Sequence, residues 1–585
     1  MRSFHVRSLV RLGVVFAIAS LVIGACTSPA PGTSPGASAG QAQKGGRVIF
    51  GDFADAKVLQ PVFSNDVPSS DVTGLIYPRL LGVDPNSGQP VPELAEKWDV
   101  SPDSKTVTFT LRDGLVWSDG SPFSGEDFKL TAEAVMRSNN GVRKNIFQDI
   151  VGARDYGTGC DGCTGKAPDI SGIVVNGKTI TVNFTKAFCP ALINVGGFRI
   201  IPKSVFGKYF DPSDPKKNLD NAPENTKPPL SMGPFLFKEW IPNDHITLTR
   251  NDKYWRGAPL LDEVVFKVVP NATALAAALK TGEVDIGSVE AKDRDDLKAS
   301  GNLQFFSVPG RGYTYIGWNE LRGGKEFFQD KNIRQALSYG LNMGAVIDKI
   351  LLGEGKKITS HTVPVYWSYD AAGLNTYDFN PQKAQQLIES SGWTKGSDGI
   401  YQKGGQKLQF SIVTNSGNTT RETLLQVATE QYKAIGVQVD PKTESFEALV
   451  DRLTKSKDAK YGDQGGHDYD AVIIGWSLGS DPDGYSIWHS SQIPGGGNNF
   501  VGYKSPAVDK ALEDERTMCT TDQRKAAFKN FDKQLNDDQP YNFGFAPNYL
   551  VFANNKIQGL QPGPFGGNTG KGLTEWNFEK IWVKQ

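Results

Sequence analysis

Between residues 46 and about 310, apolar and polar residues alternate in short runs. A period of two is typical of strands with one buried face, and such strands usually pair antiparallel. We expect strands at Arg47–Gly51, Thr106–Leu111, Thr179–Phe184, Ile246–Arg250 and Glu263–Val269. Helices interrupt this pattern, for example the Ala- and Leu-rich run Thr273–Lys280, which stops at Gly282.

The pattern changes in the second half of the chain. The apolar run 408–414 predicts a strand, and residues 421–435 then carry apolar side chains at helical spacing. The short run VQV, a helix at Phe446–Leu453 and the strand YDAVII follow. Strands that alternate with helices predict a parallel sheet with crossover helices. Asn380-Pro381 begins a further capped helix.

The N-terminus predicts export. Residues 1–11 contain three arginines and no acid, and residues 12–25 are apolar or small throughout. This combination is typical of a secretory signal, and the apolar run is shorter than the roughly 20 residues of a membrane span. Cys26 follows directly, and Ile23-Gly24-Ala25-Cys26 resembles a bacterial lipobox. We expect a signal peptide at 1–25 and a lipid on Cys26, which would anchor the protein outside the cytoplasm, on the cell membrane.

Residues 26–45 are nearly all Ser, Pro, Gly, Ala and Thr, which is typical of a flexible tether. The roughly 540 residues that follow are too many for one core, so two or three domains are expected. The whole chain has 63 basic and 64 acidic residues, without a long charge run. This balance argues against nucleic acid as a partner.

Four cysteines remain besides Cys26, namely Cys160, Cys163, Cys189 and Cys519. In an exported protein, four thiols most often form two disulfides. Three pairings are possible, and the sequence does not choose among them. The pairing that we favour joins Cys160 to Cys163 and Cys189 to Cys519.

Gly475-Trp476-Ser477-Leu478-Gly479 matches the G-x-S-x-G pattern of a hydrolase nucleophile elbow. Such an elbow turns from its strand directly into a helix. Here the turn-forming sequence Ser-Asp-Pro-Asp-Gly (480–484) follows instead, and the only histidine after Ser477 is His489. We therefore do not expect Ser477 to be a nucleophile.

Other catalytic or cofactor motifs do not stand out. The chain has no phosphate-binding loop, no dinucleotide-binding glycine pattern after a strand and no H-E-x-x-H. A glycosidase built from two distant acids remains an alternative that the sequence leaves open. A single His489 more often packs or caps than binds metal. We expect a protein without catalysis, cofactor or metal.

Several segments together resemble one family. They are LAEKWDVSPDSKTVTFTLRDGLVWSDGSPFSGEDF (94–128), MGPFLFKEWIPNDHITLTRNDKYWRGAPLLDEVVFKVVP (232–270), LKTGEVDIG (279–287), NIRQALSYGLNMGAVI (332–347), YDAVIIGWSLGSDPD (469–483), NNFVGYKSPAVDKALEDE (498–515) and DDQPYNF (537–543). In this order they resemble the bacterial extracellular solute-binding proteins of the peptide, oligopeptide and nickel type. These are lipoproteins of ABC importers, and the resemblance runs from about residue 46 to the C-terminus.

The resemblance implies an α/β fold with mixed sheets, a periplasmic-binding-protein-like clamshell of type II (Venus flytrap). Lobe I would comprise 46–310 and 540–585, with an extra domain at about 86–195, and lobe II would comprise 311–539. Ligand would lie between the lobes and stabilise their closure. The partners implied are a peptide or other small solute and the permease subunits of an ABC transporter. We expect a monomer.

The same resemblance places the strand that ends at Gly475, Trp476 and Ser477 beside the bound peptide. Main-chain groups there would pair with any peptide irrespective of its side chains. Further wall candidates are Phe53, Tyr313, Trp318, Trp488, Asn499 and Phe500.

One position departs from the family pattern. Peptide binders of this family carry an Asp three residues after the Trp, which pairs with the peptide amine, whereas this chain has Gly479. Asp481 could replace that Asp if the turn brings it round. If it does not, the ligand would be a peptide held differently, an oligosaccharide or another solute.

Overall fold

The computed structural model describes residues 42–160, 162–211, 213–214, 216–454, 468–493, 497–568 and 576–584. The predicted signal peptide and Cys26 lie outside these residues, as does most of the predicted tether. Within the described residues, no helix is long and apolar enough to cross a membrane.

Twelve strands of the described chain form one mixed sheet. Along its main path it runs β19 (Gln438–Glu444), β18 (Gln409–Asn415), β20 (Ala471–Ser477), β13 (Gly312–Trp318), β21 (Tyr541–Asn554), β11 (Ile286–Val289), β1 (Arg47–Asp52), β10 (Glu263–Val268), β9 (His245–Arg250) and β8 (Phe235–Ile241). Two more strands, β12 (Leu303–Pro309) and β14 (Gly355–Lys357), pair with β21. The short strands expected from alternation in the first half are therefore present at β1, β9 and β10.

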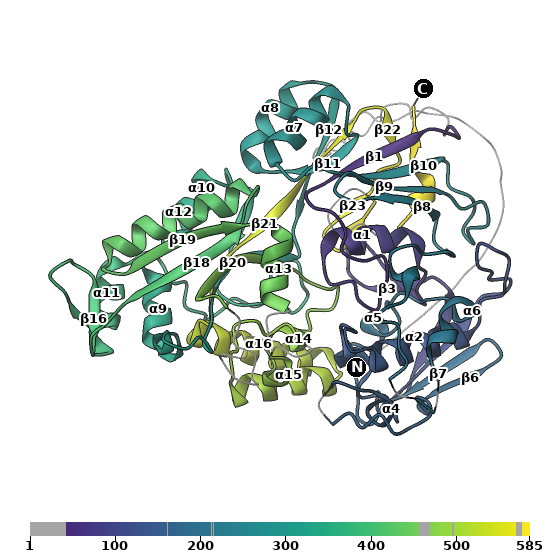
Figure 1. Ribbon diagram of the computed structural model, residues 1–585, viewed down its shortest axis with the longest axis horizontal. Helices are drawn as coiled ribbons and strands as arrows, with labels where there is room; N and C mark the ends of the chain where they lie inside the picture. The colour runs from purple at the N-terminus through teal and green to yellow at the C-terminus, as the bar shows by residue number, and fades with distance from the viewer. Residues whose placement is uncertain are drawn as a thin grey trace, which may run out of the picture. The chain divides into compact units, whose positions relative to one another are not determined.

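The long strand β21 joins two parts of this sheet. Its first half pairs with β13 and β14, and its second half pairs with β11 and β12. Figure 1 shows it in yellow between the green strands β18 and β20 and the darker strands β11 and β1. Because β12 leads into β13 through Gly310 and Arg311, the chain passes between the two parts a second time there.

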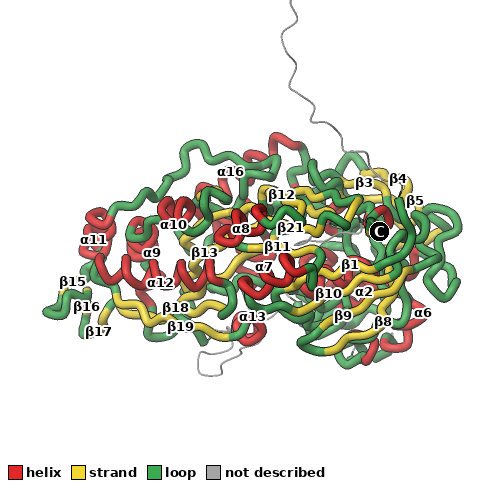
Figure 2. The backbone as a smooth tube through the Cα atoms, turned by 90° about the horizontal axis from the view of Figure 1, so that it is seen from above, coloured by secondary structure: helices red, strands yellow, loops and turns green. Residues whose placement is uncertain are grey.

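The parallel sheet predicted for the second half is confirmed. Strand β18 pairs parallel with both β19 and β20. The connections are the helices α12 (Thr419–Ala434) and α13 (Phe446–Thr454), and Figure 2 shows α12 alongside β18 and β19. Asn418 caps α12 by accepting a hydrogen bond from the Arg421 amide, so the helix begins two residues before its predicted start.

The described chain contains further helices of at least six residues. They are α1 (Val67–Ile76), α2 (Gly125–Arg137), α7 (Ala272–Thr281), α8 (Arg294–Ala299), α9 (Lys331–Tyr339), α10 (Met343–Lys349), α11 (Pro381–Ser390), α15 (Pro506–Thr517) and α16 (Thr521–Asp538). As expected, α7 ends at Gly282, which adopts the left-handed conformation (φ 77°) that glycine tolerates best.

Smaller sheets stand apart from the main one. Within the stretch predicted as an extra domain, β4 (Ala95–Val100), β5 (Thr106–Leu111), β7 (Thr179–Asn183) and β6 (Ile173–Asn176) form a four-stranded antiparallel sheet. The rest are β15–β16–β17 (Thr394–Lys395, Tyr401–Lys403, Gln406–Lys407), β2–β3 (Leu81–Val83, Pro90–Pro92), β22–β25 (Ile557–Gln558, Trp582–Val583) and β23–β24 (Pro562–Gly563, Gly566–Gly567).

Two disulfides occur among the described residues. Cys160 is bonded to Cys163, and Cys189 is bonded to Cys519. These are the two pairs that we favoured among the three possible pairings. The first closes a local loop, and the second links the segment after β7 to the turn between α15 and α16.

Candidate functional site

A cavity of about 860 Å³ is lined by residues from both parts of the main sheet. This volume falls within the range of about 300–1,000 Å³ that is usual for small-ligand sites. Its walls come from the loops after β1 and β11, the beginning of β13, the loop between β18 and α12, the end of β20 and the middle of β21.

The end of β20 lines this cavity through Gly475, Trp476 and Ser477. On one side these residues pair with the start of β13. On the other side β18 pairs with β20 at Ala471 and Val472, and the Thr414 hydroxyl donates to the Ile473 carbonyl (2.8 Å). Beyond that point, no described strand pairs with this side of β20, so its edge is open toward the cavity.

Two further predicted wall residues, Phe53 and Tyr313, also line the cavity. The Phe53 ring meets the ring of Phe446 edge to face, with 5.1 Å between centroids. Phe500 does not line the cavity but stacks on Trp476 at 5.1 Å and supports that side chain from behind.

The other aromatic and amide candidates are core residues, which corrects our expectation for them. Trp318 is fully buried and stacks on Phe328. Trp488 is fully buried and donates its indole N–H to His361 (3.0 Å). Asn499 is also fully buried, and its amide donates to the Tyr503 carbonyl (2.8 Å). Aromatic and amide side chains are suited both to a ligand wall and to a core. None of the three is among the residues that line the cavity.

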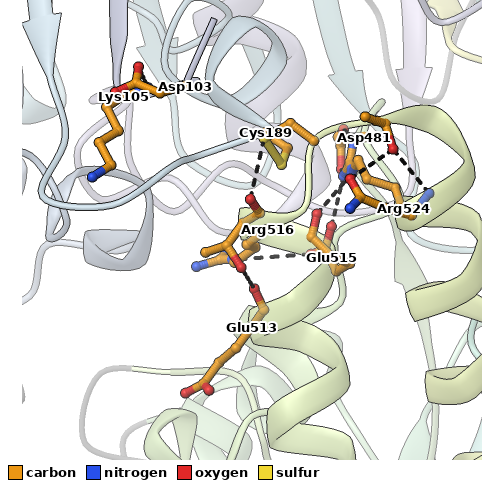
Figure 3. Close-up of a disulfide and its surroundings, with 12 residues drawn as sticks. Asp103, Lys105, Cys189, Asp481, Glu513, Glu515, Arg516 and Arg524 are labelled. Carbon is orange, nitrogen blue, oxygen red and sulfur yellow. Dashed lines mark hydrogen bonds and ion pairs between the residues drawn. A yellow bond between two sulfur atoms is a disulfide. The ribbon is translucent and has the colours of Figure 1, made fainter.

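Asp481 does not line the cavity, and its carboxylate belongs to the buried ion-pair network shown in Figure 3. Arg524 donates to both of its carboxylate oxygens, at 2.8 and 3.0 Å, and also to Glu515 at 2.8 Å. Burial and the nearby Asp483 raise the pKa of Glu515 well above its usual value. Asp481 therefore anchors the turn after β20, and our expectation that it could take a peptide amine is not supported.

Acidic side chains predominate among the described residues that line the cavity. Seven are acidic and two, Lys57 and Arg421, are basic. The acids are Asp52, Asp55, Asp66, Asp71, Glu290, Glu354 and Glu447. Some have protein partners: Asp55 accepts from the Trp240 indole at 2.9 Å, and Glu354 accepts from Arg294 at 2.8 Å. The charge balance nevertheless favours a ligand that carries a cationic group.

Sequence reasoning missed the segment from the end of β18 to the first turn of α12, which contributes Asn415, Asn418 and Arg421 to the cavity lining. A usable signal was present. Ligands of open α/β sheets bind outside the carboxyl ends of parallel strands. Because β18 and β20 are parallel neighbours, their carboxyl ends lie at the same edge. The family resemblance placed only the end of β20 at the ligand, and the rule would have added Asn415, which ends β18.

Ser477 has none of the surroundings of a nucleophile in the described chain. No helix follows it directly, because the next helix, α14, begins at Tyr485. His489 lies outside the cavity lining and bonds to Ser491 (2.8 Å). Among the described residues, no group of three or more His, Cys, Asp or Glu side chains is placed to hold a metal ion.

Comparison with known proteins gives a consistent result. The chain is 29% identical over 580 residues to the oligopeptide-binding protein AppA of Bacillus subtilis (strain 168), covering 98% of each chain. The structure of Bacillus subtilis AppA in complex with a nonapeptide superposes with a TM-score of 0.80 at 27% identity, covering 93% of this chain and 100% of that one.

A second solved structure shares the fold. Lactococcal OppA, complexed with an endogenous peptide in the closed conformation, gives a TM-score of 0.77 at 23% identity, covering 92% of this chain and 100% of that chain. These likenesses show the two-lobe α/β clamshell with mixed sheets. The model for bacterial extracellular solute-binding proteins, family 5 (Middle), matches residues 89–498. The chain therefore belongs to this family of extracytoplasmic solute-binding proteins, which bind solutes and are not enzymes.

Proposed function

We propose that this protein captures peptides outside the cytoplasm and delivers them to the permease of an ABC importer. The observation that carries the proposal is the open edge of β20 at Gly475–Ser477, which lines the cavity. An extended peptide laid along such an edge gains main-chain hydrogen bonds whatever its side chains are. The peptide-bound relatives support the same ligand class.

Capture would work by closure of two lobes around the peptide. We propose the boundaries 46–310 with 540–585 for lobe I, including the extra domain at about 86–195, and 311–539 for lobe II. The passages of the chain at β12–β13 and at β21 support this division. Direct contacts also join the proposed lobes beside the cavity: Lys57 pairs with Asp451 at 2.7 Å, and Asn65 bonds to Asn498 at 3.2 Å. A ligand that contacts both walls stabilises such a closed state.

The N-terminal part of the proposal rests on the sequence. Residues 1–25 would be removed as a signal peptide, and Cys26 would carry the lipid that holds the protein on the membrane. Residues 26–45 would then be the tether between lipid and folded part. A monomer on such a tether can reach a permease in the same membrane.

Ligand class can be tested with the purified full-length protein in detergent. Pools of short peptides and of oligosaccharides would be added separately, with native mass spectrometry and the melting temperature as readouts. We expect peptides to bind and to raise the melting temperature, since a ligand at about 100 times its Kd adds about 2.7 kcal/mol to the stability of the folded state. Binding of oligosaccharides without binding of peptides would contradict the proposal.

A further inference from the structure

The disulfide between Cys189 and Cys519 joins the two proposed lobes. Cys189 lies in the stretch of about 86–195 that we assign to the extra domain of lobe I. Cys519 lies between α15 and α16, in the proposed lobe II. The chain itself passes between these lobes at β12–β13 and at β21, so the disulfide is a third covalent connection between them.

Buried packing supports the assignment of the two cysteines to different lobes. Phe188, next to Cys189, is buried in a cluster with residues of the four-stranded sheet β4–β5–β7–β6. Leu512 of α15 and Phe528 of α16, on either side of Cys519 in the chain, are buried in a cluster with residues of β20. Each cysteine is thus fixed to a different core, and the bond couples the movement of one core to that of the other.

Hydrogen bonds accompany the disulfide between the same two segments. The Cys189 amide donates to the Arg516 carbonyl at 2.8 Å (Figure 3), and the guanidinium of this arginine donates to the Asn145 carbonyl at 3.4 Å. The Asn194 amide donates to Asp483 at 3.4 Å. If the lobes separate, water can replace these partners at a small net cost. Nothing replaces the disulfide, which has to be reduced before the two segments can part.

The disulfide lies at the far end of a helix that leads to the hinge. The two passages of the chain lie side by side, because β12 and β13 both pair with β21, and together they form one hinge. Cys519 precedes the first turn of α16, and the other end of α16 leads into β21. The 18 residues of this helix span about 27 Å.

That length decides how strongly the bond restrains opening. A hinge rotation of about 15° displaces a point about 27 Å from the axis by about 7 Å. The Cα atoms of Cys189 and Cys519 are 5.0 Å apart. A disulfide spans at most about 7 Å between Cα atoms, so the bond allows only about 2 Å of further separation.

We propose that the Cys189–Cys519 bond restrains the opening of the lobes, so that the protein with this bond releases its ligand more slowly than the protein without it. The inference rests on the lobe boundaries of the proposed function but not on the class of ligand. The bond excludes conformations in which the lobes are far apart, and it leaves the closed conformation accessible. A larger share of the ligand-free protein is then already competent to bind, which tightens binding.

The restraint leaves a route by which a ligand enters. Beside the cavity the proposed lobes meet through non-covalent contacts, such as the ion pair of Lys57 with Asp451 at 2.7 Å. The rings of Phe53 and Phe446 also meet there, with 5.1 Å between centroids. A rotation about the line that joins the hinge to the disulfide separates these contacts without stretching either connection.

The test compares three full-length proteins in detergent. They are the wild type, the double variant Cys189→Ser/Cys519→Ser and the matched control Cys160→Ser/Cys163→Ser, whose lost disulfide lies within the extra domain. Small-angle neutron scattering, at the contrast that matches the detergent, gives the radius of gyration of each ligand-free protein. Stopped-flow fluorescence gives the rate at which a fluorescein-labelled peptide, chosen from the pool for binding to the wild type, is displaced by excess unlabelled peptide.

We expect the double variant Cys189→Ser/Cys519→Ser to have a larger radius of gyration than the wild type and to release peptide about 10-fold faster, since affinity changes among related variants arise mostly in dissociation. The control should match the wild type in both measurements. Loss of a disulfide lowers the melting temperature of either double variant, so a role in stability alone would not separate the two.

A second experiment applies if the double variant Cys189→Ser/Cys519→Ser does not fold. The control variant, once folded, would be treated with dithiothreitol. This dithiol transfers two electrons and two protons to the Cys189–Cys519 bond, yielding two thiols, and becomes a cyclic disulfide itself. Reduction should then produce the same expansion and the same faster release.

Equal radii and equal release rates with and without the Cys189–Cys519 bond would overturn the inference. Equal acceleration in the untreated control variant would also overturn it, because lost stability would then explain the change. If the wild type binds no peptide, the proposed function is overturned, and neutron scattering of the ligand-free proteins still decides whether the bond restrains the lobes.

Discussion

Arg421 and Arg524 lie in the same half of the chain, but Arg421 is half-buried and Arg524 is buried, and their surroundings differ. Arg524 meets Asp481 and Glu515, each within 3.0 Å, in the turn network that follows β20. Arg421 meets the single amide oxygen of Asn415 at 2.7 Å and faces the cavity. A buried charge with its counter-charge in the same chain serves the fold.

Removal of each arginine should separate the two roles most clearly. Arg524→Met leaves the carboxylates of Asp481 and Glu515 buried without their cation, so we expect a loss of about 3–5 kcal/mol in the free energy of unfolding. Arg421→Met leaves no buried carboxylate behind, and its loss should be below about 1 kcal/mol. Urea denaturation of the ligand-free proteins measures both. Equal losses for the two variants would show that Arg421, too, serves the fold.

Glu320 is a largely buried acid that has no close ion-pair partner among the described residues. Its closest basic partner is Arg334, at 3.6 Å, and burial raises its pKa to about 7. Because the folded value lies above the ordinary 4.5, the folded state favours the protonated form. This contribution to stability is complete below pH 4.5 and is lost as the pH rises through about 7.

The variant Glu320→Gln removes this titration. Between pH 4.5 and 8, the wild type should lose up to about 3 kcal/mol of stability relative to the variant. Denaturation curves of both proteins at several pH values provide the measurement. If the two stabilities change in parallel across this range, the carboxyl group of Glu320 titrates in the folded protein as it does in the unfolded chain.

The smallest effect is expected where the charges are exposed. Lys510 and Asp514 form an ion pair of 2.8 Å across one turn of α15, and the lysine side chain is 71% exposed. Water and salt screen such a pair, so Lys510→Ala should change the free energy of unfolding by no more than about 0.5 kcal/mol. The same urea assay, repeated at high salt, should reduce even this difference. A larger effect would mean that burial is not what separates Arg524 from the surface pairs.

Local patterns were sufficient to predict several of the elements that lie beside the cavity. Periodicity and capping residues within each segment predict the strand β18, the helix α12 and the strand β20. Their parallel arrangement then follows from the alternation of strands and helices. The end of β20 at the ligand cavity came from the family resemblance, and the cavity lining includes Gly475, Trp476 and Ser477.

The direction of side chains in the turn after β20 could not be predicted in this way. Asp481 pairs with Arg524, which lies 43 residues further along the chain. A pattern within the turn itself does not predict so distant a partner. Trp488 is buried against His361, a still more distant residue. Arg421 was missed because it belongs to the segment that follows β18, whereas the family resemblance placed only the end of β20 at the cavity.

The bond between Cys189 and Cys519 requires that most of the chain has already been made. Cys160 and Cys163 are separated by 3 positions and meet as soon as both have emerged, whereas Cys189 and Cys519 are separated by 330. At a synthesis rate of about 5–20 residues per second, that separation corresponds to tens of seconds. During this interval Cys160 and Cys163 are the other cysteines of the folded part that have been made, and Cys519 is not yet present. Any bond that Cys189 makes to Cys160 or Cys163 before then has to be undone by thiol–disulfide exchange before the observed pairing can form.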